Sequence, residues 1–376
     1  EDENFFIISS TINAILKFKK SFELNTDPLK NYLLTRHFMS NKDTCYKGIS
    51  VFKNGSINSY SLSKKKIFYS SYDNPFNWIS EKKYNEYSKM DENEIIELLD
   101  LKLTEQAKIM IPKIDFGCIV SGGIDSTLQS AIISKIKQPK NNLVINHVGK
   151  DKIMDHINKF NDYFKNKIKK IKLDKHEYSK LAKNCYKIVS SPMHTHDLPG
   201  RLLISKQFRK LKCKVFFSAD GCDELLGGQQ IYHKIFNKSF DYKVNQSPYS
   251  SLNKISGIKP SENIQNFLNK NWKLGFNKYG FIKFKKERNI QNSLFLDYFI
   301  QSIAVGNRSN DLISCNSSVE PRNIYISKNI LKFLVNLPLK YKINFREKNV
   351  NLRQKFILKK LFIKYFIKKL IFGKEG

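Results

Sequence analysis

The stretch FGCIVSGGIDSTLQSAII, residues 116–133, changes character twice within eighteen residues. It begins with apolar residues typical of a buried strand, passes through a loop of small residues, and ends with the apolar spacing of a helix. A strand that leads through glycines into a helix N-terminus forms a pocket for anions, because unobstructed backbone N–H groups and the helix dipole both attract negative charge. The stretch therefore predicts a strand over 114–120, a phosphate-binding loop, and a helix over about 126–136.

The loop carries one carboxylate and two hydroxyls. A bare carboxylate would repel a polyphosphate, so Asp125 indicates a Mg²⁺ ion that binds both groups. The hydroxyls of Ser121 and Ser126 can donate hydrogen bonds to the same phosphate oxygens. An ordinary glycine-containing turn with a serine N-cap is the alternative interpretation. The proposed phosphate-binding residues are Ser121, Gly122, Gly123, Ile124, Asp125 and Ser126.

A second stretch, FFSADGCDELLGGQQIY at residues 216–232, also runs from a strand into an acidic loop that contains glycines. Asp220, Asp223 and Glu224 place three carboxylates within five residues. Such a cluster is unfavourable unless a cation lies among the carboxylates. This loop therefore indicates a second contribution to a cation site, and a solvated acidic loop is the alternative.

These motifs resemble those of a known enzyme family. The first loop is similar to the SGGxDS loop of the PP-loop ATP pyrophosphatases, which cleave ATP between its α and β phosphates. The second loop resembles the SGDGxDELFGGY motif of asparagine synthetases and their relatives. Residues 308–344 are similar to a segment of the same enzymes that ends in Leu-Pro, and residues 355–361 to the K-x-x-L-R start of a helix. The residues in register within the third motif are Asp311, Ser314, Ser318, Glu320, Arg322, Leu337 and Pro338.

The resemblance implies a fold, two cofactors and a set of site residues. The fold would be α/β, with a parallel-sheet PP-loop domain of the adenine nucleotide alpha hydrolase type and a helical C-terminal part. ATP and Mg²⁺ would be the cofactors, and Asp125 and Asp223 would be both metal ligands and catalytic residues. Glu320 and Arg322 are also assigned to catalysis, bracing the site from a helix, with a purely structural ion pair as the alternative. The nucleotide-binding residues would be those of the first loop together with Ser218, Asp220 and Gly221.

The pattern along the chain agrees with a parallel sheet, because strands that alternate with helices favour right-handed crossovers between parallel neighbours. Residues 294–376 are predicted to be mostly helical, with interruptions near Pro321 and Pro338. The other predicted elements are strands over 141–149, 167–173 and 214–218 and helices over 91–111, 153–164 and 202–211.

Residues 1–80 form a separate predicted domain, a strand-rich α+β region that precedes the synthetase-like domain of residues 81–376. Asn54 and Gly55 predict a hairpin turn, since this dipeptide readily adopts positive φ. The region resembles the last strands of the family's glutaminase domain, in which an N-terminal Cys attacks glutamine. No Cys precedes Cys45. We therefore expect a C-terminal remnant of that N-terminal-nucleophile domain in a fragment of a longer protein, with a naturally shortened enzyme as the alternative.

The charge and the cysteines limit the choice of partners. The net charge is +32, yet only eight of the 66 basic residues are Arg, whereas nucleic-acid surfaces favour the arginine fork. We expect small-molecule substrates, no nucleic acid and no membrane, and leave a homodimer open. The chain has neither an apolar run of about 18 residues nor a signal peptide, which indicates a cytoplasmic protein. Its six scattered Cys residues indicate reduced thiols rather than a zinc site.

The chemistry implied by the resemblance is adenylation of an acceptor carboxylate, release of pyrophosphate, and displacement of AMP by ammonia derived from glutamine. Aspartate is the acceptor that the family suggests. However, Leu312 stands where the family usually carries Lys or Arg near the transferred phosphate, and Ser191-Pro192 replaces its Glu-Pro. The other departures are Ala219, Gln229 and a loop with His194, His196 and Asp197, a candidate contact for the acceptor.

These departures leave three alternatives to an asparagine synthetase. A relative could amidate another carboxylate, such as a sugar uronic acid, or close a ring within its substrate. A tRNA-modifying PP-loop enzyme would make use of the net charge of +32. A catalytically impaired binding protein would explain Leu312.

Overall fold

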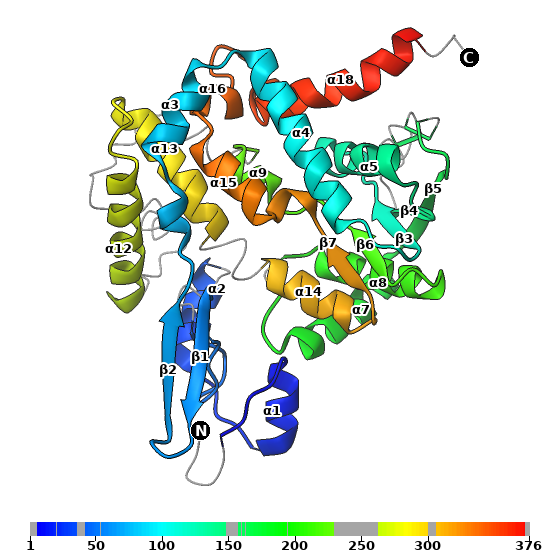
Figure 1. Cartoon of the computed structure of the whole chain (residues 1–376). Coiled ribbons are helices and arrows are strands. Elements are labelled where there is room, and N and C mark those ends of the chain that lie inside the picture. The colour runs from blue at the N-terminus through cyan, green and yellow to red at the C-terminus, as the bar shows by residue number, and fades with distance from the viewer. Residues whose placement is uncertain are drawn as a thin grey trace.

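The centre of the molecule is a five-stranded parallel sheet in the order β5-β4-β3-β6-β7 (Figure 1). All of its strand pairs are parallel, which confirms the predicted α/β class. The strands are β3 (Phe116–Ile119), β4 (Asn141–His147), β5 (Ile168–Leu173), β6 (Val215–Phe217) and β7 (Glu320–Arg322). The computed structural model describes residues 6–19, 21–35, 42–52, 54–147, 157–158, 160–161, 163–193, 195–228, 262–299 and 306–372.

Helices cover both faces of this sheet (Figure 1). The three central strands β4, β3 and β6 are short and mostly buried, and a parallel sheet of this kind is stable only when both of its apolar faces are covered. The helix that begins at Glu92 is capped by Asp91, which forms a capping box with Glu94. The acidic residues at its start are typical of a helix N-terminus. One face carries α4 (Glu92–Met110), α5 (Ile124–Ile136) and α18 (Phe356–Phe372), and the other carries α7 (Lys175–Val189), α8 (Leu198–Lys210) and α14 (Arg308–Cys315).

The position of Glu320 and Arg322 corrects the sequence prediction. Both residues lie on the strand β7 rather than on a helix. Among the strands that the structure describes, β7 pairs with β6 alone, at the edge of the sheet. Pro321 has no N–H to donate, and an edge strand can accommodate it because one side of its backbone needs no ladder partner. A strand of three residues centred on proline leaves no alternation that sequence analysis could detect.

Two further helices differ from the prediction. The sequence analysis did not predict α7, which begins after the N-cap Asp174 and ends at Ser190 in the left-handed conformation, with φ 52°. Helix α8 begins four residues earlier than predicted, with Pro199 in its first turn, where proline is favoured. Of the helix predicted over 153–164, residues 157–158 are helical, residues 160–161 and 163–164 form turns and a bend, and the other six residues lie outside the described part of the chain.

The C-terminal part is helical, as predicted. An interruption at Pro338 separates two of its helices, because Pro338 occupies the N-cap position of the second. The helices in this part and in the connections to it are α9 (Cys222–Leu225), α12 (Glu262–Lys278), α13 (Lys285–Leu296), η4 (Ile324–Ile326), α15 (Lys328–Asn336), α16 (Leu339–Lys342) and α17 (Val350–Arg353).

The N-terminal part contains a separate antiparallel sheet of two strands, β1 (Ser56–Ser61) and β2 (Lys66–Ser71). This hairpin turns at residues 62–65 rather than at Asn54-Gly55 as predicted. Gly55 does adopt φ 64°, but residues 49–52 before it form no strand, while Lys53 lies outside the described residues.

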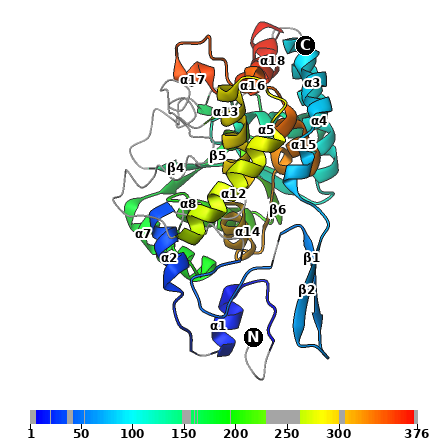
Figure 2. The same cartoon turned by 90° about the vertical axis from the view of Figure 1, so that its left-hand side faces the viewer.

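Helices complete this region. They are α1 (Ile12–Lys19), α2 (Thr26–Thr35), η1 (Pro75–Trp78) and α3 (Glu81–Lys89). Figures 1 and 2 both place the hairpin and α1 at one end of the molecule, away from α18. Tyr32 on α2 donates a hydrogen bond to the carbonyl of Pro192, 2.5 Å away, which connects this end to the loop between α7 and α8.

Two further findings concern membrane-spanning helices and disulfides. Within the described ranges, no helix is both long and apolar enough to cross a membrane. All six cysteines lie in these ranges and none forms a disulfide.

Candidate functional site

The two predicted loops leave adjacent strands at the same edge of the sheet. Residues 120–123 lead from β3 into α5, and residues 218–221 lead from β6 into α9. β4 and β5 lie on one side of β3, whereas β6 and β7 lie on the other. Open parallel sheets bind ligands at the carboxyl ends of their strands, at the point where the strand order reverses in this way. The fold therefore brings both loops to the position expected of a ligand site.

The first loop has the backbone geometry of an anion site. Gly122 adopts φ 77°, a conformation that favours glycine. Gly123 is the N-cap of α5, and no side chain caps this helix, so its first N–H groups are available to an anion. The hydroxyl oxygens of Ser121 and Ser126 lie 2.8 Å apart, and Ser126 Oγ accepts from the Ser121 N–H. The two serines thus hold the loop closed beside the helix N-terminus.

Asp125 and Asp223 meet at one ammonium group. Nζ of Lys355 lies 2.6 Å from Oδ2 of Asp125 and 2.5 Å from Oδ1 of Asp223. Lys355 directly precedes α18, so groups from three distant parts of the chain converge here. The sequence analysis expected these two carboxylates to share a magnesium ion. In the structure, the cation between them is a lysine that was not assigned to the site.

Burial controls the electrostatics of this cluster. The side chains of Asp125 and Lys355 are 14% and 12% exposed, and that of Asp223 is 45% exposed. Burial raises the pKa of Asp125 to about 6, with Lys355 opposing the shift and Asp223 adding to it. Burial would lower the pKa of Lys355, but the two carboxylates outweigh it and raise that pKa. Lys355 is therefore charged at neutral pH.

The double glycine after the second loop makes room for this cluster. A Cβ on Gly228 would lie 1.9 Å from Oδ1 of Asp223 and 2.3 Å from Cε of Lys355. Gly227 adopts φ 68°, and a Cβ there would lie 2.6 Å from Ile343. Neither position can carry a larger residue without displacing its neighbours. The chain can pass this close to the two charges only as glycine.

In the second loop, Asp220 is bound to other groups of the protein. Asp220 accepts from Nη2 of Arg201 at 2.7 Å and from the hydroxyl of Ser218 at 2.9 Å. Its carbonyl accepts from Nδ2 of Asn323 at 2.6 Å. Gly221 adopts φ 88° at the start of α9. Asp220 therefore stabilises the loop, and Arg201 and Asn323 are supporting residues that sequence analysis missed.

Glu320 and Arg322 bind each other. Nε of Arg322 lies 2.8 Å from Oε1 of Glu320, and Nη1 of Arg322 donates to the carbonyl of Met110. Within the described residues, no hydrogen bond or ion pair joins either side chain to Asp125 or Asp223. This arrangement fits the structural ion pair that the sequence analysis kept as an alternative.

The histidine loop contributes little to the described site. His196 and Asp197 lie 3.3 Å apart on the surface, with side chains 85% and 69% exposed. His194 and Gln229, two other departures from the family motifs, lie outside the described residues. The signal for Lys355 was present in the sequence, as the first residue of the K-x-x-L-R match, but its role depends on a contact across 230 residues.

The residues present fit a divalent cation. Oδ1 of Asp125 is buried and has no hydrogen-bond partner within the described part of the chain. In that part, no group of three or more His, Cys, Asp or Glu side chains could hold a metal ion. Mg²⁺ is commonly bound through one or two carboxylates together with phosphate oxygens. Asp125 and Asp223 match that type of site.

The protein is thus an α/β protein with two adjacent acidic loops and an uncapped helix N-terminus at the point where a parallel sheet reverses its strand order. Phosphate-containing ligands commonly bind at sites of this kind. The family model "Asparagine synthase" matches residues 103–371. The chain therefore belongs to the asparagine synthase family, which makes it a ligase-type enzyme.

Two other comparisons complete this finding. Among solved structures, the NMN synthetase from Francisella tularensis is similar, with 13% identity and a TM-score of 0.27. That similarity covers 49% of this chain and 94% of the synthetase. Among curated proteins, no match was found.

Proposed function

We propose that this protein activates a carboxylate with ATP and converts it into an amide. The acceptor carboxylate attacks the α-phosphorus of ATP and pyrophosphate leaves. Ammonia then displaces AMP from the acyl adenylate, which yields the amide. The observation that carries this proposal is the convergence of Asp125 and Asp223 on one cation beside the uncapped N-terminus of α5.

The side chains of the site would act by positioning and by neutralising charge. The backbone N–H groups at the start of α5 would bind the β and γ phosphates. Lys355 would approach the developing negative charge of the phosphates, since its ammonium already lies at the centre of the site. Mg²⁺, held by Asp125 and Asp223, would neutralise charge on the departing pyrophosphate. Glu320 and Arg322 would position β7 and the segment that follows it.

The finer identity rests on resemblance. By that resemblance, the acceptor is aspartate, ammonia comes from glutamine, and the protein is a cytoplasmic asparagine synthase of the glutamine-hydrolysing type. Residues 1–80 would then be the C-terminal remnant of a glutaminase domain and residues 81–376 the synthetase domain. Leu312 and Ser191 favour a second candidate, an amidotransferase that acts on another carboxylate, because both replace charged residues of the family.

Pyrophosphate release tests the proposal. The protein with Mg-ATP and ammonia should release pyrophosphate only when a suitable carboxylate is added, and the panel would contain aspartate, sugar uronic acids and other small acids. The Asp125→Asn variant should lower the rate by about 100-fold or more, since a charged group at the reacting phosphates is lost. The matched control is Asp115→Asn, an exposed carboxylate paired with Lys140, which should retain full activity.

Each outcome distinguishes one hypothesis. Stimulation by aspartate supports an asparagine synthetase, and stimulation by another acid supports the second candidate. Stimulation by tRNA alone would overturn the proposal in favour of a tRNA-modifying enzyme. Absence of release with every addition would indicate an inactive relative.

A further inference from the structure

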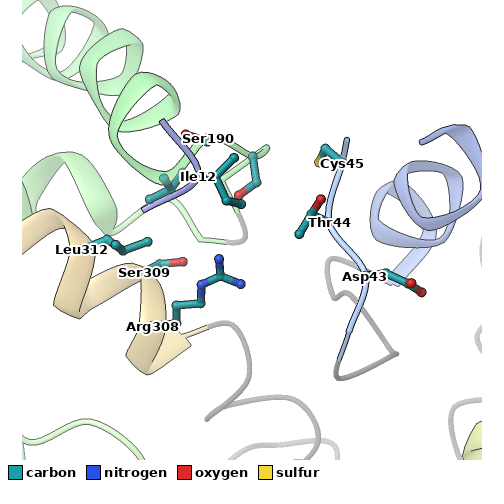
Figure 3. A pocket seen from close by; sticks show the side chains of 10 residues that line it. Ile12, Asp43, Thr44, Cys45, Ser190, Arg308, Ser309 and Leu312 are labelled. Carbon is teal, nitrogen blue, oxygen red and sulfur yellow. The ribbon is translucent and has the colours of Figure 1, made fainter. Parts of the chain in front are cut away.

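A pocket with both apolar and polar lining residues lies where the N-terminal part meets the sheet domain (Figure 3). It is a cavity of about 30 Å³ between the start of α1, the end of α7 and the start of α14. Ile12, Val189 and Leu312 form its apolar walls, and Arg308, Ser190 and Ser309 supply polar groups. None of its lining residues belongs to the cluster of Asp125, Asp223 and Lys355.

Arg308 is the only cationic side chain that lines this pocket in the described part of the chain. Figure 3 shows its guanidinium pointing from the start of α14 into the space between Ile12 and Thr44. Within the described residues, no hydrogen bond or ion pair holds this group. Burial lowers the pKa of Arg308, and no carboxylate in the described part of the chain compensates for this effect. A half-buried guanidinium with five donors and no partner favours an anionic ligand.

Ser190 supplies an independent indication of a ligand. This residue is 5% exposed, and its Oγ is buried without a hydrogen-bond partner among the described residues. The large majority of buried hydroxyls are hydrogen-bonded, because an unpaired one loses its contacts with water. Two residues whose side-chain polar groups have no partner among the described residues, Ser190 and Arg308, therefore line the same small cavity.

The composition of the pocket favours a carboxylate over a phosphate. One guanidinium balances one negative charge, and its two parallel N–H groups match the two oxygens of a carboxylate. A phosphate carries up to two charges at neutral pH, and the second would remain uncompensated between Ile12, Val189 and Leu312. The carboxylate of Asp43, which also lines the pocket, points away from Arg308 in Figure 3.

The surroundings also indicate the size of the ligand. A neighbouring cavity of about 690 Å³ is lined by N-terminal residues, and it shares Ile12, Thr44 and Arg308 with the small pocket. The small pocket has room for a carboxylate group, and the wider cavity has room for the rest of an organic acid. Cys45 also lines the small pocket, but burial raises its pKa to about 11, so its thiol is protonated and unreactive at neutral pH.

We propose that Arg308 and Ser190 bind the carboxylate group of a small organic acid, whose body occupies the wider cavity. Arg308 forms a two-pronged ion pair with the carboxylate, and the Ser190 hydroxyl donates to one of its oxygens. This site is separate from the nucleotide loops. It stands whether or not the protein forms an amide.

Calorimetric titration without ATP tests this site. The probes are acetate, succinate and L-glutamate, with inorganic phosphate as the contrasting anion. At least one carboxylate should bind, and Arg308→Met should weaken that binding by about tenfold or more, because hydrogen bonds to charged groups contribute about 1.5–3 kcal/mol. Ser190→Ala should weaken it less, and Arg308→Lys should lie between the wild type and Arg308→Met.

Two controls separate this site from other effects. Arg209→Met removes an exposed arginine at the end of α8 and should leave binding unchanged. Asp125→Asn should also leave it unchanged, which distinguishes this site from the nucleotide site. Equal binding by the wild type and Arg308→Met, binding of phosphate in preference to every carboxylate, or absence of carboxylate binding would each overturn the proposal. If Arg308→Met does not fold, the carboxylate affinities of the wild type, Arg308→Lys and Ser190→Ala are compared instead. Equal affinities in the three proteins would overturn the proposal.

Discussion

One ammonium group holds the two acidic loops together. Lys355 adopts φ 51°, which is uncommon for a residue with a side chain, and its N–H donates to the carbonyl of Leu226. Such conformations persist where the surrounding structure fixes them, and they are frequent at functional sites. The position of the Lys355 ammonium group is thus fixed by its own backbone and by the carboxylates of Asp125 and Asp223.

The Lys355→Met variant should be clearly less stable than the wild type. It leaves the carboxylates of Asp125 and Asp223 close together without a cation. Loss of one partner from a buried ion pair costs about 3–5 kcal/mol, and the partial exposure of Asp223 places the expected loss at about 3 kcal/mol. Urea unfolding at pH 7 measures this difference. Lys140→Met, which breaks an exposed ion pair with Asp115, should cost less than about 1 kcal/mol, and equal losses in the two variants would contradict the account.

Lys342 should make the stability depend on pH. This lysine is 1% exposed, and burial lowers its pKa to about 7. Between pH 7 and about 10 the unfolded chain therefore binds more protons at this position than the folded protein does. The contribution of Lys342 to the free energy of unfolding then rises with pH, by about 2 kcal/mol between pH 7 and pH 9.

Urea unfolding of the wild type and of Lys342→Met at pH 7 and pH 9 checks this expectation. The variant lacks the titrating group, so the stability of the wild type relative to Lys342→Met should rise between the two pH values. Lys340→Met changes an exposed lysine on the same helix and should preserve the pH dependence of the wild type. A constant difference between wild type and Lys342→Met would show that Lys342 is charged in the folded protein.

At the level of elements, sequence patterns predicted four strands of the sheet but missed the edge strand β7. The stretch that contains β3 and α5 was predicted because a buried strand, a glycine loop and a helix differ in apolar spacing. β7 was missed because it is short and contains Pro321. The candidate site depends on local patterns in the same way, because Asp125 and Asp223 belong to short sequence motifs that could be recognised. The role of Lys355 depends on a contact across 230 residues, which no local pattern contains.

The packing of β3 against α8 depends on a glycine. A Cβ on Gly117 would lie 2.1 Å from Cε1 of Phe208 and 3.0 Å from the carbonyl oxygen of Asn141. Phe208 is fully buried and stacks on Phe216, so it has little room to move. We expect Gly117→Ala to lower the free energy of unfolding by about 3 kcal/mol, at the upper end of the usual cost of overpacking.

Gly200→Ala is the matched control for this packing. Gly200 lies in α8, and a Cβ there would be 3.7 Å from its nearest neighbours, Ile145 and Leu173, which is an ordinary contact distance. The free energy of unfolding of Gly200→Ala, measured in urea, should stay within about 1 kcal/mol of that of the wild type. Should Gly117→Ala prove as stable as Gly200→Ala, the description of this interface would be wrong.

At the level of the whole molecule, the N-terminal part and the sheet domain meet around α14. The sheet domain carries the two acidic loops, while the N-terminal part contributes Ile12 and Thr44 to the Arg308 pocket. Sequence analysis could not predict this pocket, because its residues come from segments about 300 positions apart and follow no motif. The net charge of +32 gives the surface a general attraction for anions, but it specifies neither site.

The products formed from ATP test the central claim most directly. ³¹P NMR of the protein with Mg-ATP, ammonia and the acceptor that stimulates turnover would identify them. The account predicts equal amounts of AMP and pyrophosphate, because the two acidic loops would hold the β and γ phosphates as the leaving group. Formation of ADP and orthophosphate, or persistence of intact ATP with every acceptor, would contradict it.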